Sequence, residues 1–275
     1  MNRLVLFART VAFVLLLGPA GCGKADDATK IRLASTTSFD DTGLADVLLP
    51  AFTSETGIQV EMVAKGTGEA LAIAERGDAD VVLVHARKAE DAFMAKGSGV
   101  ERRDVWWNRF LIAGPADDPA GIRAATTAKD ALAKIGAVNA RFMSRGDDSG
   151  THKREKDLWG ASPKGSAYQE TGQGQGPTLV IASEKKAYVL TDEGTFLKMQ
   201  SKLALVSLFA GDPALKNPYG AIVVKESARG PARFAAAKRF IEWLTGPKAK
   251  ALVQSFTVDG KRAFFLPDET PPADR

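Results

Sequence analysis

Short runs of β-branched and aliphatic residues alternate with amphipathic helical patterns along most of this 275-residue chain. Residues 31–34, 58–63 and 80–84 predict strands, and the segment after each of them places apolar residues at helical spacing. Residues 108–113 and 203–208 predict further strands. The run at 80–84 is rich in valine, as is typical of a strand that a parallel sheet buries on both faces. Because strands that alternate with helices form parallel sheets covered by helices, the sequence predicts an α/β fold.

Two stretches rich in glycine, proline and aspartate interrupt this alternation, at residues 114–119 and 211–218. They bracket a middle block of about 100 residues, which is the size of a domain. The simplest arrangement is a discontinuous first lobe, residues 30–113 and 219–266, into which a second lobe, residues 114–218, is inserted. We therefore expect two lobes, each with a mostly parallel sheet flanked by helices, joined by two crossover segments.

The N-terminal residues have the pattern of a secretory signal peptide. Two arginines precede an apolar stretch at residues 11–17, which is shorter than the ~20 residues that a membrane-spanning helix needs. Cleavage after Ala20 and cleavage before Cys22, which would then be lipidated, are both compatible with the sequence. We expect residues 1–21 to form the leader, and the mature protein to reach the periplasm or the extracytoplasmic face of the inner membrane.

The composition argues against several classes of function. The chain has 37 Lys and Arg, 33 Asp and Glu and a formal charge of +4, and the two signs are interspersed, unlike a nucleic-acid-binding surface. One cysteine and two histidines are too few for a disulfide or for a dense transition-metal cage. The sequence therefore predicts no nucleic-acid partner, no metal site and no cofactor, and we expect a monomer.

Small polar loops follow several of the predicted strands, at the points where helices begin. Ser35, Thr36, Thr37 and Ser38 come directly after the first strand, and four hydroxyl residues in a row exceed what a helix cap needs. Hydroxyl groups and the free N–H groups at a helix N-terminus bind an anion without adding negative charge. This loop therefore predicts one half of an oxyanion site.

The loop at residues 144–152 predicts the other half. Arg145 offers a planar fork of donors that suits a tetrahedral oxyanion, and one of the two aspartates in the loop is expected to orient it. Ser149 and Thr151 add hydroxyl groups, and the backbone at Gly150 opens the next helix. We expect these residues to face the hydroxyl loop across a cleft.

Three weaker signals complete the set. Thr67 lies in a Gly-Thr-Gly turn between a strand and a helix, and Gly172 lies in a glycine-rich turn that lets a ligand approach the backbone. The glycine-rich turn is neither a phosphate loop nor a dinucleotide fingerprint, because it lacks their lysine and their glycine spacing. His85 follows a strand and could contribute to the cleft, although a single histidine is more often structural.

The ordered set of motifs resembles that of tungstate-binding receptors of the TupA type, and the arginine loop alone is similar to the anion loop of periplasmic phosphate-binding proteins. The resemblance covers nearly the whole chain after the leader. The matching segments are Ser-Thr-Thr-Ser at 35–38, Asp-Thr-Gly at 41–43, Gly-Thr-Gly at 66–68, Val-His-Ala at 84–86, Ser-Arg-Gly-Asp-Asp-Ser-Gly-Thr-His at 144–152, Thr-Gly-Gln-Gly at 171–174 and Asn-Pro-Tyr-Gly at 217–220. One departure is Ser35, where such receptors commonly have threonine; both residues keep a hydroxyl.

This resemblance implies a type II periplasmic binding fold. It also implies a tungstate ligand held in the cleft by the hydroxyl run and the arginine loop. An ABC permease and its ATPase would be the partners to which the receptor delivers the anion.

Other ligands, and one enzymatic interpretation, have to be weighed. Tungstate, molybdate and sulfate are fully deprotonated near neutral pH and require only donors, whereas phosphate profits from an acceptor because its second pKa is about 6. The hydroxyl-rich loops therefore favour the fully deprotonated anions, although Asp40 or Asp41 could face the ligand as an acceptor. Tungstate is the first expectation, with molybdate bound comparably or more weakly and phosphate or sulfate as the alternative. Residues 146–150 carry one aspartate more than the serine-protease signature, and an α/β pattern is not that of those barrels. We expect a receptor and not an enzyme.

Overall fold

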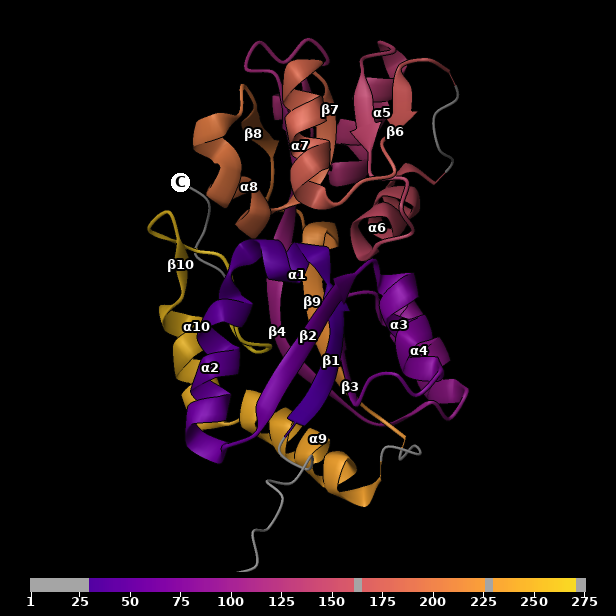
Figure 1. Cartoon of the computed structure of the whole chain (residues 1–275). Coiled ribbons are helices and arrows are strands. Elements are labelled where there is room, and N and C mark those ends of the chain that lie inside the picture. The colour runs from indigo at the N-terminus through magenta and orange to yellow at the C-terminus, as the bar shows by residue number, and fades with distance from the viewer. Residues whose placement is uncertain (1–29, 161–164, 226–229, 271–275) are drawn as a thin grey trace, which may run out of the picture.

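The computed structural model describes residues 30–160, 165–225 and 230–270 (Figure 1). The predicted leader, its cleavage site and Cys22 lie outside the described residues. Within the described part of the chain, no helix is both long enough and apolar enough to span a bilayer.

A sheet of nine strands runs through the described molecule in the order β2-β1-β3-β9-β4-β7-β5-β6, and β8 also pairs with β4. The strands β1, β2 and β3 are parallel, as are β5, β6 and β7, whereas β4 and β9 run antiparallel to their neighbours. The predicted α/β fold is confirmed. The strands are β1 (Lys30–Thr36), β2 (Gln59–Lys65), β3 (Val81–Val84), β4 (Gly99–Gly114), β5 (Phe142–Ser144), β6 (Tyr168–Glu170), β7 (Tyr188–Asp192), β8 (Val206–Phe209) and β9 (Lys216–Val224).

Helices pack on both faces of the sheet because successive residues of its buried strands point to opposite sides. In β3, Val81 and Leu83 join the core beneath α2 and α9, while Val82 and Val84 join the core beneath α3 and α4. The α-helices are α1 (Thr37–Thr42), α2 (Leu44–Thr56), α3 (Thr67–Glu75), α4 (Arg87–Ala95), α5 (Ala128–Ala137), α6 (Gly150–Trp159), α7 (Gln175–Glu184), α8 (Glu193–Met199), α9 (Pro231–Leu244) and α10 (Pro247–Ser255).

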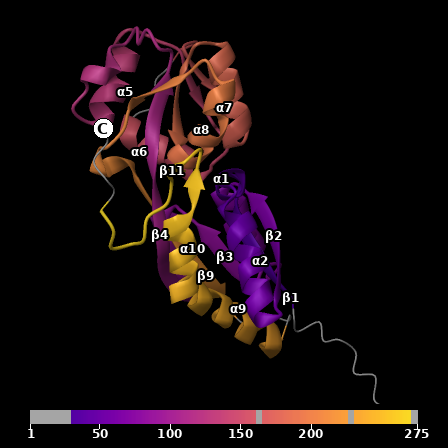
Figure 2. The same cartoon turned by 90° about the vertical axis from the view of Figure 1, so that its left-hand side faces the viewer.

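The hydrophobic core of the described residues forms four clusters, which we group in pairs as lobe I and lobe II. Lobe I buries residues of β1, β3 and β9 with α2, α3, α4, α9 and α10, and lobe II buries residues of β5 and β7 with α5, α7 and α8. Strand β4 belongs to both lobes, because it pairs with β9 up to Arg109 and with β7 from Phe110 onward (Figure 2). The start of β9 makes a second connection. The boundaries at 113/114 and 218/219 stay a prediction, and both lie close to these connections.

Several elements differ from those predicted. The predicted strand at 108–113 is only the second half of β4, whose first half carries charged residues that obscured its pattern. The hydroxyl run is not a loop, because β1 continues through Thr36 and α1 begins at Thr37. The predicted strand at 203–208 begins later, as β8, and the second predicted break contains the start of β9. The sequence also missed β6, β7, α8 and the hairpin of β10 (Thr257–Val258) and β11 (Lys261–Arg262).

Candidate anion-binding site

Three helices begin where the two lobes meet: α3 from lobe I, and α6 and α7 from lobe II (Figure 1). The turn before α3 touches the turn before α6, since a Cβ on Gly66 would lie 3.2 Å from the carbonyl oxygen of Asp147. The turn before α7 reaches the short helix α1, since a Cβ on Gly174 would lie 3.7 Å from Thr37 Oγ1. Because the first N–H groups of a helix lack partners within it and carry partial positive charge, this junction favours an anion.

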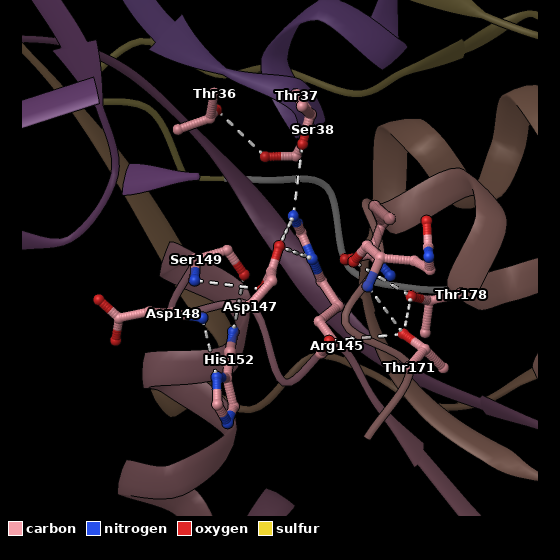
Figure 3. A network of polar contacts seen from close by, with 12 residues as sticks. Thr36, Thr37, Ser38, Arg145, Asp147, Asp148, Ser149, His152, Thr171 and Thr178 are labelled. Atoms are coloured by element: carbon pink, nitrogen blue, oxygen red, sulfur yellow. Dashed lines mark hydrogen bonds and ion pairs between the residues drawn. The ribbon is translucent and has the colours of Figure 1, made fainter. Parts of the chain in front are cut away.

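Arg145 is the buried cation of the junction, with 2% of its surface exposed. Its Nε and Nη2 atoms donate to Asp147 Oδ2 at 3.1 and 2.5 Å, and Nη2 also donates across the lobes to Thr37 Oγ1 at 3.3 Å (Figure 3). Asp147 is therefore the aspartate that orients the arginine, while Asp148 pairs with Lys153 at 2.8 Å. Among the described residues, the guanidinium bonds use only Nε and Nη2, which leaves Nη1 for a ligand.

Two threonine hydroxyls are buried at the junction without a hydrogen-bond partner among the described residues. Thr67 is the first residue of α3 and Thr151 the second residue of α6, and their exposed fractions are 0% and 1%. A buried polar group without a partner costs about 1–3 kcal/mol, and native proteins leave few of them. A ligand that accepts a hydrogen bond from either hydroxyl would offset this cost. Their place at the N-termini of α3 and α6 makes the two threonines candidate donors, one from each lobe.

The hydroxyl run contributes in several ways. Ser35 donates to the carbonyl oxygen of Leu83 at 2.8 Å, which ties β1 to β3 and uses its only proton. The Thr36 hydroxyl caps α1 by accepting from the Phe39 N–H at 3.3 Å. Thr37 accepts from the arginine and keeps its own proton to donate. The ligand contact predicted for Ser35 stays a prediction, and Thr37 is the residue of the run best placed to donate.

Ser38 begins a buried chain of side chains that links the site to the strands crossing between the lobes. Its Oγ lies 3.0 Å from His85 Nε2, and His85 Nδ1 lies 2.9 Å from Asn217 Oδ1. Asn217 in turn donates to Asn108 Oδ1 at 2.6 Å. Because the Asn217 oxygen can only accept, His85 carries its proton on Nδ1, and Ser38 donates to Nε2.

His85 is neutral near pH 7, because burial lowers its pKa to about 4. Its ring also stacks on Tyr219 with the ring centroids 4.7 Å apart. The histidine therefore holds the Ser38 hydroxyl in one orientation rather than adding a positive charge to the site.

Two glycines of the predicted set act through their backbone. A Cβ on Gly150 would lie 2.7 Å from Cε1 of the His85 ring, so the missing side chain lets lobe II close against lobe I. The Gly172 N–H donates to the carbonyl oxygen of Arg145 at 2.8 Å and so holds the arginine loop. The direct ligand contact predicted for Gly172 stays a prediction.

Comparison with known proteins identifies the family. Residues 23–248 match the family model of a PBP superfamily domain. The tungstate-binding protein TupA of Peptoclostridium acidaminophilum is 40% identical over 288 residues, which cover 99% of each chain. This chain belongs to the TupA family within the PBP superfamily.

One further relative and one solved structure support this family assignment. A putative ABC transporter anion-binding protein of Haloferax volcanii is 44% identical over 257 residues, covering 90% of this chain and 75% of that protein. The solved structure of a tungstate ABC transporter from Geobacter sulfurreducens is 45% identical, has a TM-score of 0.76, and covers 82% of this chain and 98% of its own. The resemblance to TupA-type receptors is thus confirmed, and with it a substrate-binding protein rather than an enzyme.

The arginine loop does not bring the side chains of Ser149 and His152 together as a serine hydrolase would. Ser149 Oγ accepts from the backbone N–H of His152 at 3.2 Å and caps α6. The His152 ring accepts from the backbone N–H of Asp148 at 3.1 Å, through Nδ1. In the described structure this bond turns His152 to its own loop, whereas a general base would have to bond Ser149 Oγ.

The sequence did not single out Asn108 and Asn217, which complete the chain from Ser38. Asn217 lies in the Asn-Pro-Tyr-Gly segment that matches the TupA family, but its spacing gives no sign of a contact with His85. Asn108 lies in a strand that is predicted from the apolar residues around it, so nothing in the pattern marks the asparagine itself. Both are found only once β4 and β9 are paired, which places them opposite each other.

Proposed function

We propose that this protein is the extracytoplasmic receptor of an ABC importer, and that it binds tungstate between lobe I and lobe II. The observation that carries the proposal is the set of buried donors at the junction of the lobes: the guanidinium of Arg145, which bonds Thr37 across the lobes, and the hydroxyls of Thr67 and Thr151, one from each lobe. The printed names of two relatives, the tungstate-binding protein TupA of Peptoclostridium acidaminophilum and the tungstate ABC transporter of Geobacter sulfurreducens, support the choice of ligand.

The chemistry of the donors supports an anion that is fully deprotonated. Both oxygens of Asp147, the acid beside Arg145, are already occupied: Oδ2 accepts from the arginine, and Oδ1 accepts from the Ser149 N–H at 3.2 Å. Each oxygen of Asp147 therefore already accepts at least one hydrogen bond, which makes this carboxylate a poorer acceptor for the proton of hydrogen phosphate. Tungstate and molybdate, which need only donors, fit this arrangement better than phosphate does.

The bond between Arg145 and Thr37 joins the lobes across the site, which supports a mechanism of binding by closure. In this mechanism the anion first meets the donors of one lobe, and the second lobe then rotates about β4 and β9 to cover it. Closure removes water from the site, so that the same hydrogen bonds act in a lower dielectric and become stronger. The closed monomer would then be the form that docks on the permease and its ATPase.

Calorimetric titration of the protein without its leader tests this proposal, with tungstate, molybdate, sulfate and phosphate added in separate experiments. We expect tungstate to bind most tightly, molybdate with comparable or lower affinity, and sulfate and phosphate more weakly. If only phosphate binds, the ligand assigned to the receptor changes from tungstate to phosphate. No heat with any of the four anions would rule out an oxyanion receptor.

A further inference from the structure

A pocket of about 470 Å³ opens between the lobes beside the candidate site. One wall is the start of α4 in lobe I and the other is α6 in lobe II, while His85 and Gly150, which pack against each other beside the site, complete the lining. The pocket is far larger than a tetrahedral oxyanion requires. Its charged lining consists of Asp157 and five cations, Arg87, Lys88, Lys153, Arg154 and Lys156.

The charges of this lining do not cancel. Three of the cations have a carboxylate partner, and these ion pairs are Arg87 with Asp91 at 2.8 Å, Lys88 with Asp157 at 3.2 Å and Lys153 with Asp148 at 2.8 Å. Across the ranges that the structure describes, Arg154 and Lys156 form no ion pair, and Arg154 donates only to the carbonyl oxygen of Lys216 at 3.4 Å. The pocket therefore has a net positive charge that comes from α6.

The field of Arg154 reaches the site itself. Burial is the main reason for the low pKa of His85, and the positive charges of Arg145 and Arg154 lower it further. One cation stands in the site and the other in the pocket, and both act on the same ring. The charges of Arg145 and Arg154 therefore both act on His85, which lines the pocket and bonds Ser38 of the site.

We propose that this pocket is an entrance vestibule, which attracts a doubly charged oxyanion from solution and guides it toward Arg145. Arg154 and Lys156 supply the attraction, whereas the buried donors supply the binding. A cleft lined by charge of one sign raises the local concentration of the oppositely charged ligand and its association rate, and salt screens this effect. This inference rests on the proposed function, because the vestibule would be the entry route to the same anion-binding site.

The association rate of tungstate measures the vestibule directly. Stopped-flow tryptophan fluorescence would compare the wild type with the double variant Arg154→Gln and Lys156→Gln. A control that loses the same charge is Lys238→Gln with Lys250→Gln, whose exposed side chains belong to α9 and α10, away from α6 (Figure 1). We expect the vestibule variant to associate about 3- to 10-fold more slowly at low ionic strength, with the dissociation rate unchanged.

High salt separates steering from direct contact. In about 1 M NaCl, where the screening length is about 3 Å, the vestibule variant and the wild type should associate at the same rate. Three results would each overturn the vestibule. They are equal association rates of the vestibule variant and the wild type at low salt, slower association of the variant that persists at high salt, and equally slow association of the control at low salt. The single variant Lys156→Gln, at an exposed position, gives the same comparison if loss of the half-buried Arg154 impairs folding.

The wild type also distinguishes this inference from the proposed function. Failure of the wild type to bind tungstate would overturn the proposed function, and the vestibule with it. Tight binding by the wild type together with an unchanged association rate in the vestibule variant would overturn the vestibule alone.

Discussion

Replacing Gly150 with alanine tests whether closure of the two lobes produces binding. Gly150 opens α6 in lobe II, and a Cβ at this position would lie 2.7 Å from Cε1, 2.8 Å from Nδ1 and 3.2 Å from the carbonyl oxygen of His85 in lobe I. Non-bonded carbon atoms normally keep about 3.5–4.0 Å apart. The ring cannot move aside easily, because Ser38 and Asn217 bond its two nitrogens and Tyr219 stacks on its face.

The cost of this clash falls on the closed form. Overpacking by one methyl group costs about 1–3 kcal/mol, and here the two colliding groups belong to different lobes. Opening the lobes relieves the collision, and alanine is the better helix residue by up to about 1 kcal/mol. We therefore expect Gly150→Ala to weaken tungstate binding by about 5- to 150-fold. The melting temperature of the ligand-free protein should stay the same or rise.

Calorimetry and thermal unfolding of the same samples measure these two quantities. Gly136→Ala is the matched control, because it is also a helical glycine of lobe II, and its Cβ would make an ordinary 3.4 Å contact with the Trp159 ring. The control should bind tungstate as the wild type does. Wild-type affinity in Gly150→Ala, or a fall in the melting temperature large enough to account for the lost binding, would refute this account of closure.

Three further predictions concern the donors and a buried acid. Arg145→Ala should weaken tungstate binding by at least about tenfold, since charged hydrogen bonds contribute about 1.5–3 kcal/mol each, and calorimetry with unchanged affinity would contradict its role. Thr67→Val and Thr151→Val keep the side-chain shape and should each weaken binding about 10- to 150-fold. Ser35→Ala removes the bond to Leu83 and should lower the free energy of unfolding by about 1 kcal/mol. Burial raises the pKa of Glu155 from 4.5 to about 7. Between these two pH values the unfolded chain has released a proton that the native protein still holds. The free energy of unfolding therefore falls as the pH rises through this range. Glu155→Gln should therefore increase the free energy of unfolding by about 1–3 kcal/mol above pH 7 and leave it unchanged near pH 4, as urea titrations at the two pH values would show.

Local patterns of the sequence determined the type of fold and the chemistry of the site. The valine-rich run that became β3 and the helical spacing after it depend only on neighbouring residues, so they could be predicted. The arginine in a polar loop before a helix likewise indicated an anion before any contact was known. The first half of β4 could not be predicted, because its charged residues are accommodated by pairing with β9, a strand far along the chain.

Tertiary structure alone decided which polar groups are free to meet a ligand. Ser35 and Thr67 look equivalent in sequence, but the first spends its proton on Leu83, 48 residues away, while the second is buried without a partner among the described residues. Asp147 and Asp148 are adjacent, yet only Asp147 bonds the arginine, while Asp148, whose φ is 56°, pairs with Lys153. A hydroxyl or a carboxylate can bind a ligand fully only if a group from a distant part of the chain has not already formed a hydrogen bond with it. Such long-range pairing is invisible in the order of the residues, whereas the donor-rich composition of the loops is not.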